Sequence, residues 1–170
     1  MDFLELAKSR YSCRKLTGRK VEKQLLDKII AAGIAAPTAV NQQPYKIWVL
    51  QSEEAVRFIG ECTNCTFGAE VFLIVGCRES ESWTRSFDGQ NFAEVDAAIA
   101  ATHMLLEIQD LGLATTWVGW FDAPKLQKQY PQTAGYHLIA LFPVGYAAED
   151  AVPSPKHESR RSPEEACEYL

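Results

Sequence analysis

A long apolar stretch near the middle of the chain, residues 91–110, constrains the fold more than any other feature of the sequence. Four polar side chains in it are seven, four and three residues apart, so at the helical period they share one narrow stripe: Asp96, His103, Glu107 and Asp110. The rest is largely Ala, Ile, Met and Leu. The pattern predicts a long central helix that is buried on most sides. In so small a protein it also indicates a subunit interface.

Residues at both ends of this stretch predict where the helix begins and ends. Asn91, with Glu94 three residues later, is typical of a helix N-cap with its capping-box partner. Gly112 can leave the helix with a positive φ. The segment ATTWVGWF at 114–121 then predicts a short strand that contains a glycine, and we expect the chemistry of the protein there.

The overall composition predicts one globular domain over residues 1–170. Of the 170 residues, 47% are hydrophobic and 23% charged, which is enough to bury a core and is not typical of disorder. Asp2 and Glu5 interrupt the first apolar residues, and no apolar run reaches membrane-spanning length. We therefore expect a cytoplasmic protein with no membrane partner. The five cysteines are expected to be reduced thiols.

The basic residues are concentrated at the two ends of a chain whose net charge is -5. Residues 1–28 hold eight of the 17 Lys and Arg, and residues 156–161 hold three more. Residues 47–124 hold three basic side chains against twelve carboxylates. If the two ends converge, they form a positive site suited to a small phosphate-bearing ligand and too local for nucleic acid. Solvated basic ends are an equal alternative.

An alternation near the N-terminus gives that positive site candidate residues. In an extended segment, Arg10, Ser12 and Arg14 lie on one face, so two guanidinium groups flank a hydroxyl. Such a set can bind a phosphate or the polar edge of a planar ring, because Arg presents forked donors. A solvated strand would explain the same pattern.

The remaining elements follow from periodicity and from Pro and Gly. Helices are predicted over 21–36, 53–61 and 123–130, and strands over 45–51, 71–77 and 137–147. The loop between Pro37 and Pro44 gathers uncharged hydrogen-bonding side chains and is a candidate binding loop. Cys62 and Cys65 form a C-x-x-C motif, which could serve thiol redox chemistry or form half of a zinc site. Its position after a helix and before a strand disfavours the redox role, and the lack of a second ligand pair disfavours zinc.

Several motifs, in the same order along the chain, resemble the nitroreductase family of flavoproteins. They are R-Y-S-C-R at 10–14, A-P-T-A-V-N-Q-Q-P at 36–44 and D-L-G-L-A-T-T-W-V-G-W-F at 110–121, with G-Y at 145–146 and R-R-S-P-E-E at 160–165. The resemblance implies an α+β fold with a mixed central sheet flanked by helices. It also implies an interlocked homodimer, with an FMN held without a covalent bond at each of two sites at the interface.

The resemblance also assigns cofactor-binding residues. Arg10, Ser12 and Arg14 would meet the phosphate and the pyrimidine edge of the flavin. Pro37, Thr38, Ala39 and Asn41 would reach it from the loop, partly across the interface; Ala39 stands where the family commonly has a serine. Backbone amides of Val118, Gly119 and Trp120 would point at flavin N5. Arg160 and Arg161 are alternatives for the C-terminal phosphate contact.

The activity implied is that of an FMN-dependent oxidoreductase. Hydride would pass from NAD(P)H to flavin N5 and then to a nitroaromatic, a quinone or a similar acceptor in the same pocket, by a ping-pong mechanism, so no G-x-G-x-x-G fingerprint is needed. No side chain is assigned as acid or base. Substrate contacts are assigned to Trp83, Arg85, Phe87 and Trp117. The alternative is a flavin-binding carrier or sensor with little turnover, closed by Trp120.

Overall fold

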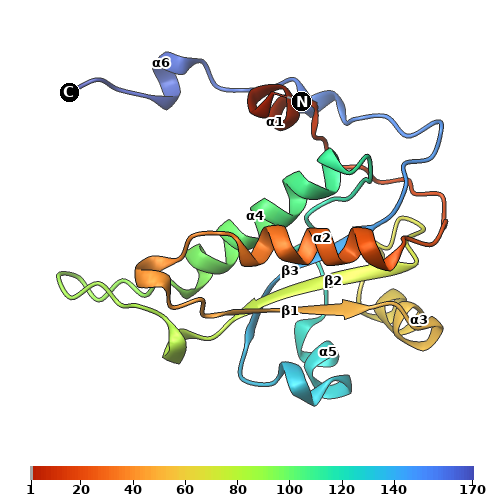
Figure 1. Ribbon diagram of the computed structural model, residues 1–170, viewed down its shortest axis with the longest axis horizontal. Coiled ribbons are helices and arrows are strands. Elements are labelled where there is room, and N and C mark those ends of the chain that lie inside the picture. Colours follow the sequence, from red (N-terminus) through yellow and green to blue (C-terminus); the bar gives the residue numbers. More distant parts are fainter. Residues whose placement is uncertain (1) are drawn as a thin grey trace.

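Three strands form a sheet whose two faces are each covered by helices (Figure 1). The computed structural model describes residues 2–170. Its helices are α1 Phe3–Ser9, α2 Lys23–Ile34, α3 Glu53–Cys62, α4 Ala93–Asp110, α5 Ala123–Gln129 and α6 Pro163–Ala166. Its strands are β1 Tyr45–Leu50, β2 Val71–Cys77 and β3 His137–Val144. The α+β class expected from the sequence is confirmed.

The sheet has the order β1-β2-β3, and both pairs of neighbouring strands are antiparallel. The expected mixed sheet is therefore wrong in strand direction. All seven residues of β2 are buried, because this strand is central and helices cover both of its faces. Its continuous apolar sequence, VFLIVGC, is typical of such a strand.

Two helix pairs enclose two separate apolar clusters. Helices α2 and α4 cover one face, where Ile29 and Met104 pack against Leu73 and Phe142. Helices α3 and α5 cover the other face (Figure 1). Helices α2 and α4 approach closely at Gly33, where a β-carbon would lie 2.8 Å from Cγ of Met104. A glycine is therefore needed at this contact between the helices.

The start of α4 and the segment after it differ from the sequence prediction. Helix α4 begins at Ala93, whose N–H donates to Asn91 Oδ1 at 3.0 Å, but Glu94 pairs with His137 and closes no capping box. The expected strand over 114–121 does not form. Instead, two isolated bridges pair Ala114 with Gly145 and Val118 with Leu141. Two separate bridges are too few to make a continuous strand ladder.

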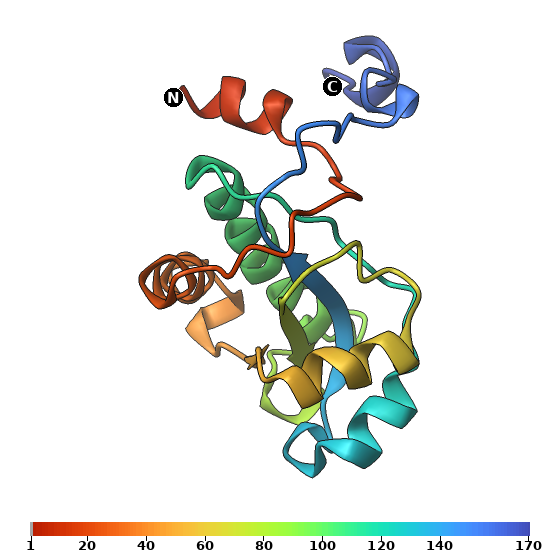
Figure 2. The same ribbon diagram turned by 90° about the vertical axis from the view of Figure 1, so that its right-hand side faces the viewer.

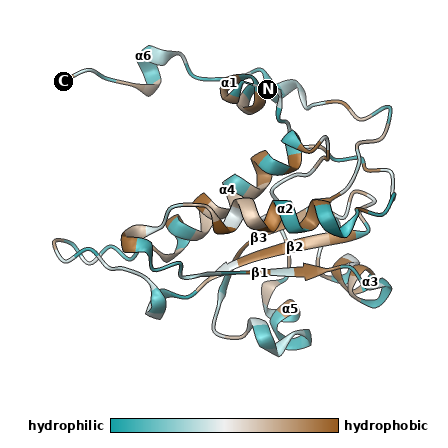
Figure 3. Ribbon diagram, viewed as in Figure 1, coloured by the Kyte–Doolittle hydropathy of each residue, from teal (hydrophilic) through white to brown (hydrophobic). Residues whose placement is uncertain are grey.

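Helix α4 is central but is not buried on most sides. Its side with Ala97, Ala101 and Met104 is buried, and so is Asp96 in the first turn. Val95 is 43% exposed, and the face that continues through Ile99 and Leu106 borders open space together with His103, Glu107 and Asp110 of the polar stripe. Figure 3 shows apolar ribbon along α4 and on α1. Helix α1 contains no buried residue, and residues 158–170 are all exposed. Figure 2 shows the two ends of the chain on the same side of the molecule, beyond the sheet.

Within residues 2–170, no helix has the length and apolar character required to cross a membrane.

Candidate functional site

A set of backbone hydrogen bonds fixes the N-terminal segment against two distant parts of the chain. The Cys13 N–H donates to the Thr115 carbonyl at 2.9 Å, and the Thr17 N–H donates to the Tyr146 carbonyl at 3.0 Å. The Lys15 side chain forms an ion pair with Asp150. Residues 10–14 therefore lie between the segment that follows α4 and the C-terminal segment.

The two ends of the chain meet in a basic pocket of about 250 Å³. Its lining residues are Arg10, Tyr11, Ser12, Arg14, Ser154, Lys156, His157 and Arg160. No carboxylate lines it among the residues that the structure describes. The structure thus brings together Arg10, Ser12, Arg14 and Arg160, as the charge distribution suggested. Their role in binding FMN stays a prediction.

The cations of this basic pocket are close enough to affect one another. Partial burial, and after it the charge of Arg160, lower the pKa of Arg10 from its usual value. The Arg160 Nη1 donates to the Ser159 carbonyl at 2.8 Å, so Arg160 is held beside the pocket by its own backbone. Converging cations without a lining carboxylate make a site that an anion would stabilise.

Four residues that line the basic pocket are not among those predicted to bind the cofactor: Tyr11, Ser154, Lys156 and His157. Lys156 had been counted in the basic C-terminal cluster without being assigned to the site. His157 is largely covered and its ring packs edge-on against Tyr11, with centroids 6.2 Å apart. The turn at residues 155–157 carries Lys156 and His157; Ser154 caps it and Pro155 begins it, so the Ser-Pro pair is the sequence signal that could have predicted the turn. Arg161 does not line the pocket, so the geometry favours Arg160.

The segment after α4 supplies the second group of candidate residues. The Val118 N–H donates to the Leu141 carbonyl at 2.9 Å, so this amide is already engaged with β3 and cannot point at a flavin as expected. The amides of Gly119 and Trp120 have no hydrogen-bond partner within residues 2–170. Trp117 packs its ring on Phe142 at a centroid distance of 5.3 Å and stays partly exposed.

Gly119 and Trp120 line a small hollow of about 320 Å³ together with Cys62 at the end of α3. The Thr63 Oγ1 donates to the Trp120 carbonyl at 2.6 Å and fixes this backbone, while the Trp120 residue remains 78% exposed. Burial raises the pKa of Cys62, which keeps it protonated near neutral pH. A reactive C-x-x-C thiolate is therefore disfavoured. Across residues 2–170, no group of three or more His, Cys, Asp or Glu is placed to hold a metal ion.

The loop that carries Pro37, Thr38, Ala39 and Asn41 lies at the other end of the molecule (Figure 1). It follows the C-terminal end of α2, whereas the basic pocket lies beyond the N-terminal end of that helix. The Ala39 N–H donates to the buried Asp96 of α4 at 2.9 Å. Within one chain, the structure does not bring this loop to the basic pocket.

The predicted substrate residues before α4 also lie away from the basic pocket, on the projecting loop at residues 82–91 (Figure 1). Trp83 packs on Phe92 with ring centroids 5.2 Å apart. The Arg85 Nε donates to Asp88 at 2.8 Å. Phe87 is 95% exposed. Phe87 is therefore the one aromatic side chain of this loop that is not covered by other groups.

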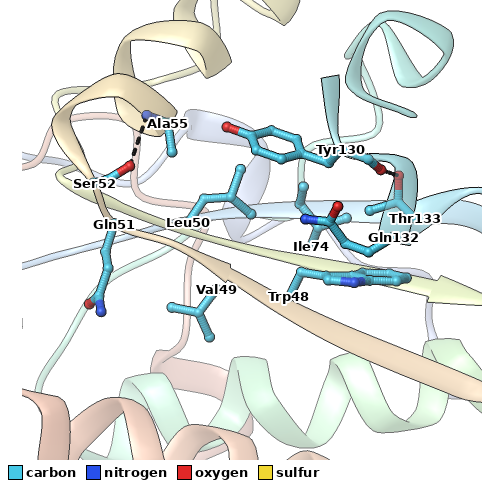
Figure 4. A pocket seen from close by; sticks show the side chains of 10 residues that line it. All are labelled: Trp48, Val49, Leu50, Gln51, Ser52, Ala55, Ile74, Tyr130, Gln132 and Thr133. Carbon is cyan, nitrogen blue, oxygen red and sulfur yellow. Dashed lines mark hydrogen bonds between the residues drawn. The ribbon is translucent and has the colours of Figure 1, made fainter. Parts of the chain in front are cut away.

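A further pocket, of about 330 Å³, lies on the α3 and α5 side of the sheet (Figure 4). Figure 4 shows the Trp48 ring and the Leu50 side chain on the same side of β1, facing Tyr130 and Gln132. None of the ten side chains drawn there is charged. It contains no residue predicted to bind a cofactor or substrate.

The fold and the basic pocket define an α+β protein in which both ends of one chain line a pocket rich in cations. The model of the nitroreductase family matches residues 7–66 and 64–146. A Methanothermobacter thermautotrophicus protein, provisionally named an NADH dehydrogenase/NAD(P)H nitroreductase, is 31% identical over 157 residues, which cover 88% of this chain and 80% of that protein. The chain therefore belongs to the nitroreductase family.

Two solved structures show how far the fold agrees. A nitroreductase family protein from Clostridium difficile 630 is 32% identical, with a TM-score of 0.90 over 99% of this chain and 98% of that chain. A protein from Desulfovibrio desulfuricans, provisionally named a nitroreductase and solved in complex with FMN, is 24% identical, with a TM-score of 0.82 over 100% of this chain and 97% of that chain. The whole chain thus takes this family's fold.

Proposed function

We propose that this protein is an FMN-dependent oxidoreductase that takes electrons from NAD(P)H and reduces a small acceptor such as a nitroaromatic compound or a quinone. The observation that carries the proposal is the basic pocket formed where the two ends of the chain meet. Family membership, the FMN bound by the Desulfovibrio relative and the name of the Methanothermobacter relative support it.

The residues of the basic pocket fit the phosphate of FMN. That phosphate carries about two negative charges near neutral pH. Arg10, Arg14, Lys156 and Arg160 supply four cations around one hollow, and Arg side chains can bind phosphate oxygens in pairs. Ser12 adds a hydroxyl on the same wall. Bound there, the anion would counter the effects of burial and, after it, of the charge of Arg160, which lower the pKa of Arg10.

The remaining candidate residues would orient the flavin ring and shape the space around it. When bound, FMN supplies the redox chemistry by taking up and releasing hydride. The unpartnered Gly119 and Trp120 amides offer two fixed donors for the polar atoms of the ring, and Thr63 holds the backbone that carries them. Trp117 and Trp120 present flat exposed surfaces that would exclude water above the ring.

We further propose that the working unit is a homodimer. The 37–43 and 82–91 loops lie at one end of the chain, and the basic pocket at the other (Figure 1). Between them runs a groove of about 850 Å³ along the open face of α4, bordered by Phe3, Val95, Ile99 and Leu106. An exposed apolar surface of this kind is typical of an interface. A second copy reversed along α4 would bury the groove and bring its loops to the first copy's basic pocket.

The visible absorption spectrum of the purified protein tests the proposed function. FMN is added, excess is removed by gel filtration, and NADH and then NADPH are added without oxygen. Two flavin bands that persist and then bleach with a pyridine nucleotide are expected. Bands that persist without bleaching would favour a flavin carrier or sensor instead, and a protein that retains no FMN would contradict the proposal.

A further inference from the structure

A buried carboxylate on α4 has a role that the proposed cofactor contacts leave unexplained. Asp96 is 1% exposed and lies in the first turn of the helix. Its Oδ1 accepts the Ala39 N–H at 2.9 Å, whereas its Oδ2 is buried and has no partner within residues 2–170. The helix dipole favours a negative charge in this turn. An unpaired buried oxygen is nevertheless costly, so packing alone does not account for an aspartate here.

The loop above Asp96 has a backbone conformation that its side chains disfavour. Val40, Asn41 and Gln43 have φ values of 45°, 59° and 52°. The left-handed region is unfavourable for residues other than glycine, and most of all for a β-branched residue such as Val40. Val40 is also 68% exposed, so burial of its side chain does not offset the strain. Such a conformation persists only where surrounding contacts fix it.

Most hydrogen bonds of this loop stay inside it. The Asn41 N–H donates to the Thr38 carbonyl at 3.0 Å, and the Gln43 N–H donates to Thr38 Oγ1 at 3.1 Å. Throughout the described chain, the bond from Ala39 to Asp96 is the single hydrogen bond that joins residues 38–43 to another segment. The loop is thus shaped by Thr38 and attached to the core by Asp96.

We infer that Asp96 is a positioning residue. It anchors Ala39 and thereby holds the loop at residues 38–43, including the left-handed Val40, Asn41 and Gln43, in one conformation. Thr38, Ala39 and Asn41 are then preformed to contact the flavin. The anchoring is read from the geometry of the chain itself. Its consequence for the cofactor rests on the proposed function, in which this loop contacts FMN.

Amide hydrogen exchange of the full-length protein without FMN tests the anchoring, and fluorescence titration with FMN tests its consequence. In Asp96→Ala, the amides of residues 38–43 should exchange about tenfold faster or more, while those of β2 are unchanged. Asp96→Asn keeps an oxygen that can accept from Ala39, so its loop should exchange at an intermediate rate. Asp27→Asn, which removes an exposed carboxylate paired with Lys23 on α2, is the matched control and should leave the loop unchanged.

The Kd for FMN should follow the same order, with an increase of about tenfold in Asp96→Ala and a smaller one in Asp96→Asn. Unchanged loop exchange in Asp96→Ala would overturn the inference. Faster exchange in the loop and β2 alike would also overturn it, because Asp96 would then support the core in general. A faster loop with an unchanged Kd would support the anchoring and overturn the loop's role in binding FMN.

Discussion

Arg160 and Arg161 are neighbours in sequence, but only Arg160 lines the basic pocket, so comparing the two gives the sharpest test of this pocket. Arg160 lines the pocket, and its charge adds to the effect of burial in lowering the pKa of Arg10, whereas Arg161 does not line the pocket. Replacing either by alanine removes the same side chain and the same unit of charge from the same exposed segment. If the pocket binds the FMN phosphate, Arg160→Ala should weaken FMN binding and Arg161→Ala should leave it nearly unchanged.

The expected loss of binding free energy in Arg160→Ala follows from how exposed Arg160 is. A hydrogen bond to a charged group contributes about 1.5–3 kcal/mol. Arg160 is exposed, so solvent screening places its contribution at the lower end, about 1.5 kcal/mol, or roughly a tenfold increase in Kd. Arg161 acts only through a screened long-range charge, and its loss should change the free energy of binding by less than about 0.5 kcal/mol.

Quenching of FMN fluorescence on titration with the apoprotein, at two salt concentrations, would measure both constants. The difference between the variants should shrink at high salt, because screening weakens charge contacts. Equal losses of FMN affinity in the two variants would show that the C-terminal segment contributes only general positive charge. A loss confined to Arg161→Ala would refute the assignment of the pocket.

Three further predictions concern the interface, the core and the thiols. Ile99→Asp places a charge on the open face of α4 and should shift the protein from dimer to monomer in analytical ultracentrifugation; an unshifted dimer would place the interface elsewhere. Gly76→Ala puts a β-carbon 2.9 Å from Leu138 Cδ2 and should lower the free energy of unfolding in urea by about 1–3 kcal/mol, whereas unchanged stability would mean that the side chain moves freely. Burial raises the pKa of Cys77 to about 11, so iodoacetamide at pH 8 should alkylate exposed Cys167 and spare Cys77, as read by mass spectrometry; equal labelling would contradict this. Because that folded-state pKa lies above the usual 9.0, the related stability is present below about pH 9 and is lost as the pH rises toward 11.

Local periodicity was sufficient to find the main helices and strands. The helical patterns of α2, α3 and α4 depend on neighbours three to four residues away, and the signal of β2 is a continuous apolar run. Both kinds of signal are visible within one segment of the chain. The predicted strand at 114–121 failed because strand formation needs a partner along its length. Only Ala114 and Val118 find one.

The sequence by itself determined the accumulation of cations at the two ends of the chain, and its motifs implied the α+β class through their resemblance to the nitroreductase family, since residue order is a property of the chain alone. Only the tertiary structure decided that Arg160 and Lys156 line the basic pocket and Arg161 does not, because a short turn sets which side chains face inward. It also decided that the Val118 amide is engaged and that Asp96 holds the distant Ala39. These are contacts between segments far apart in sequence, and no local pattern records them.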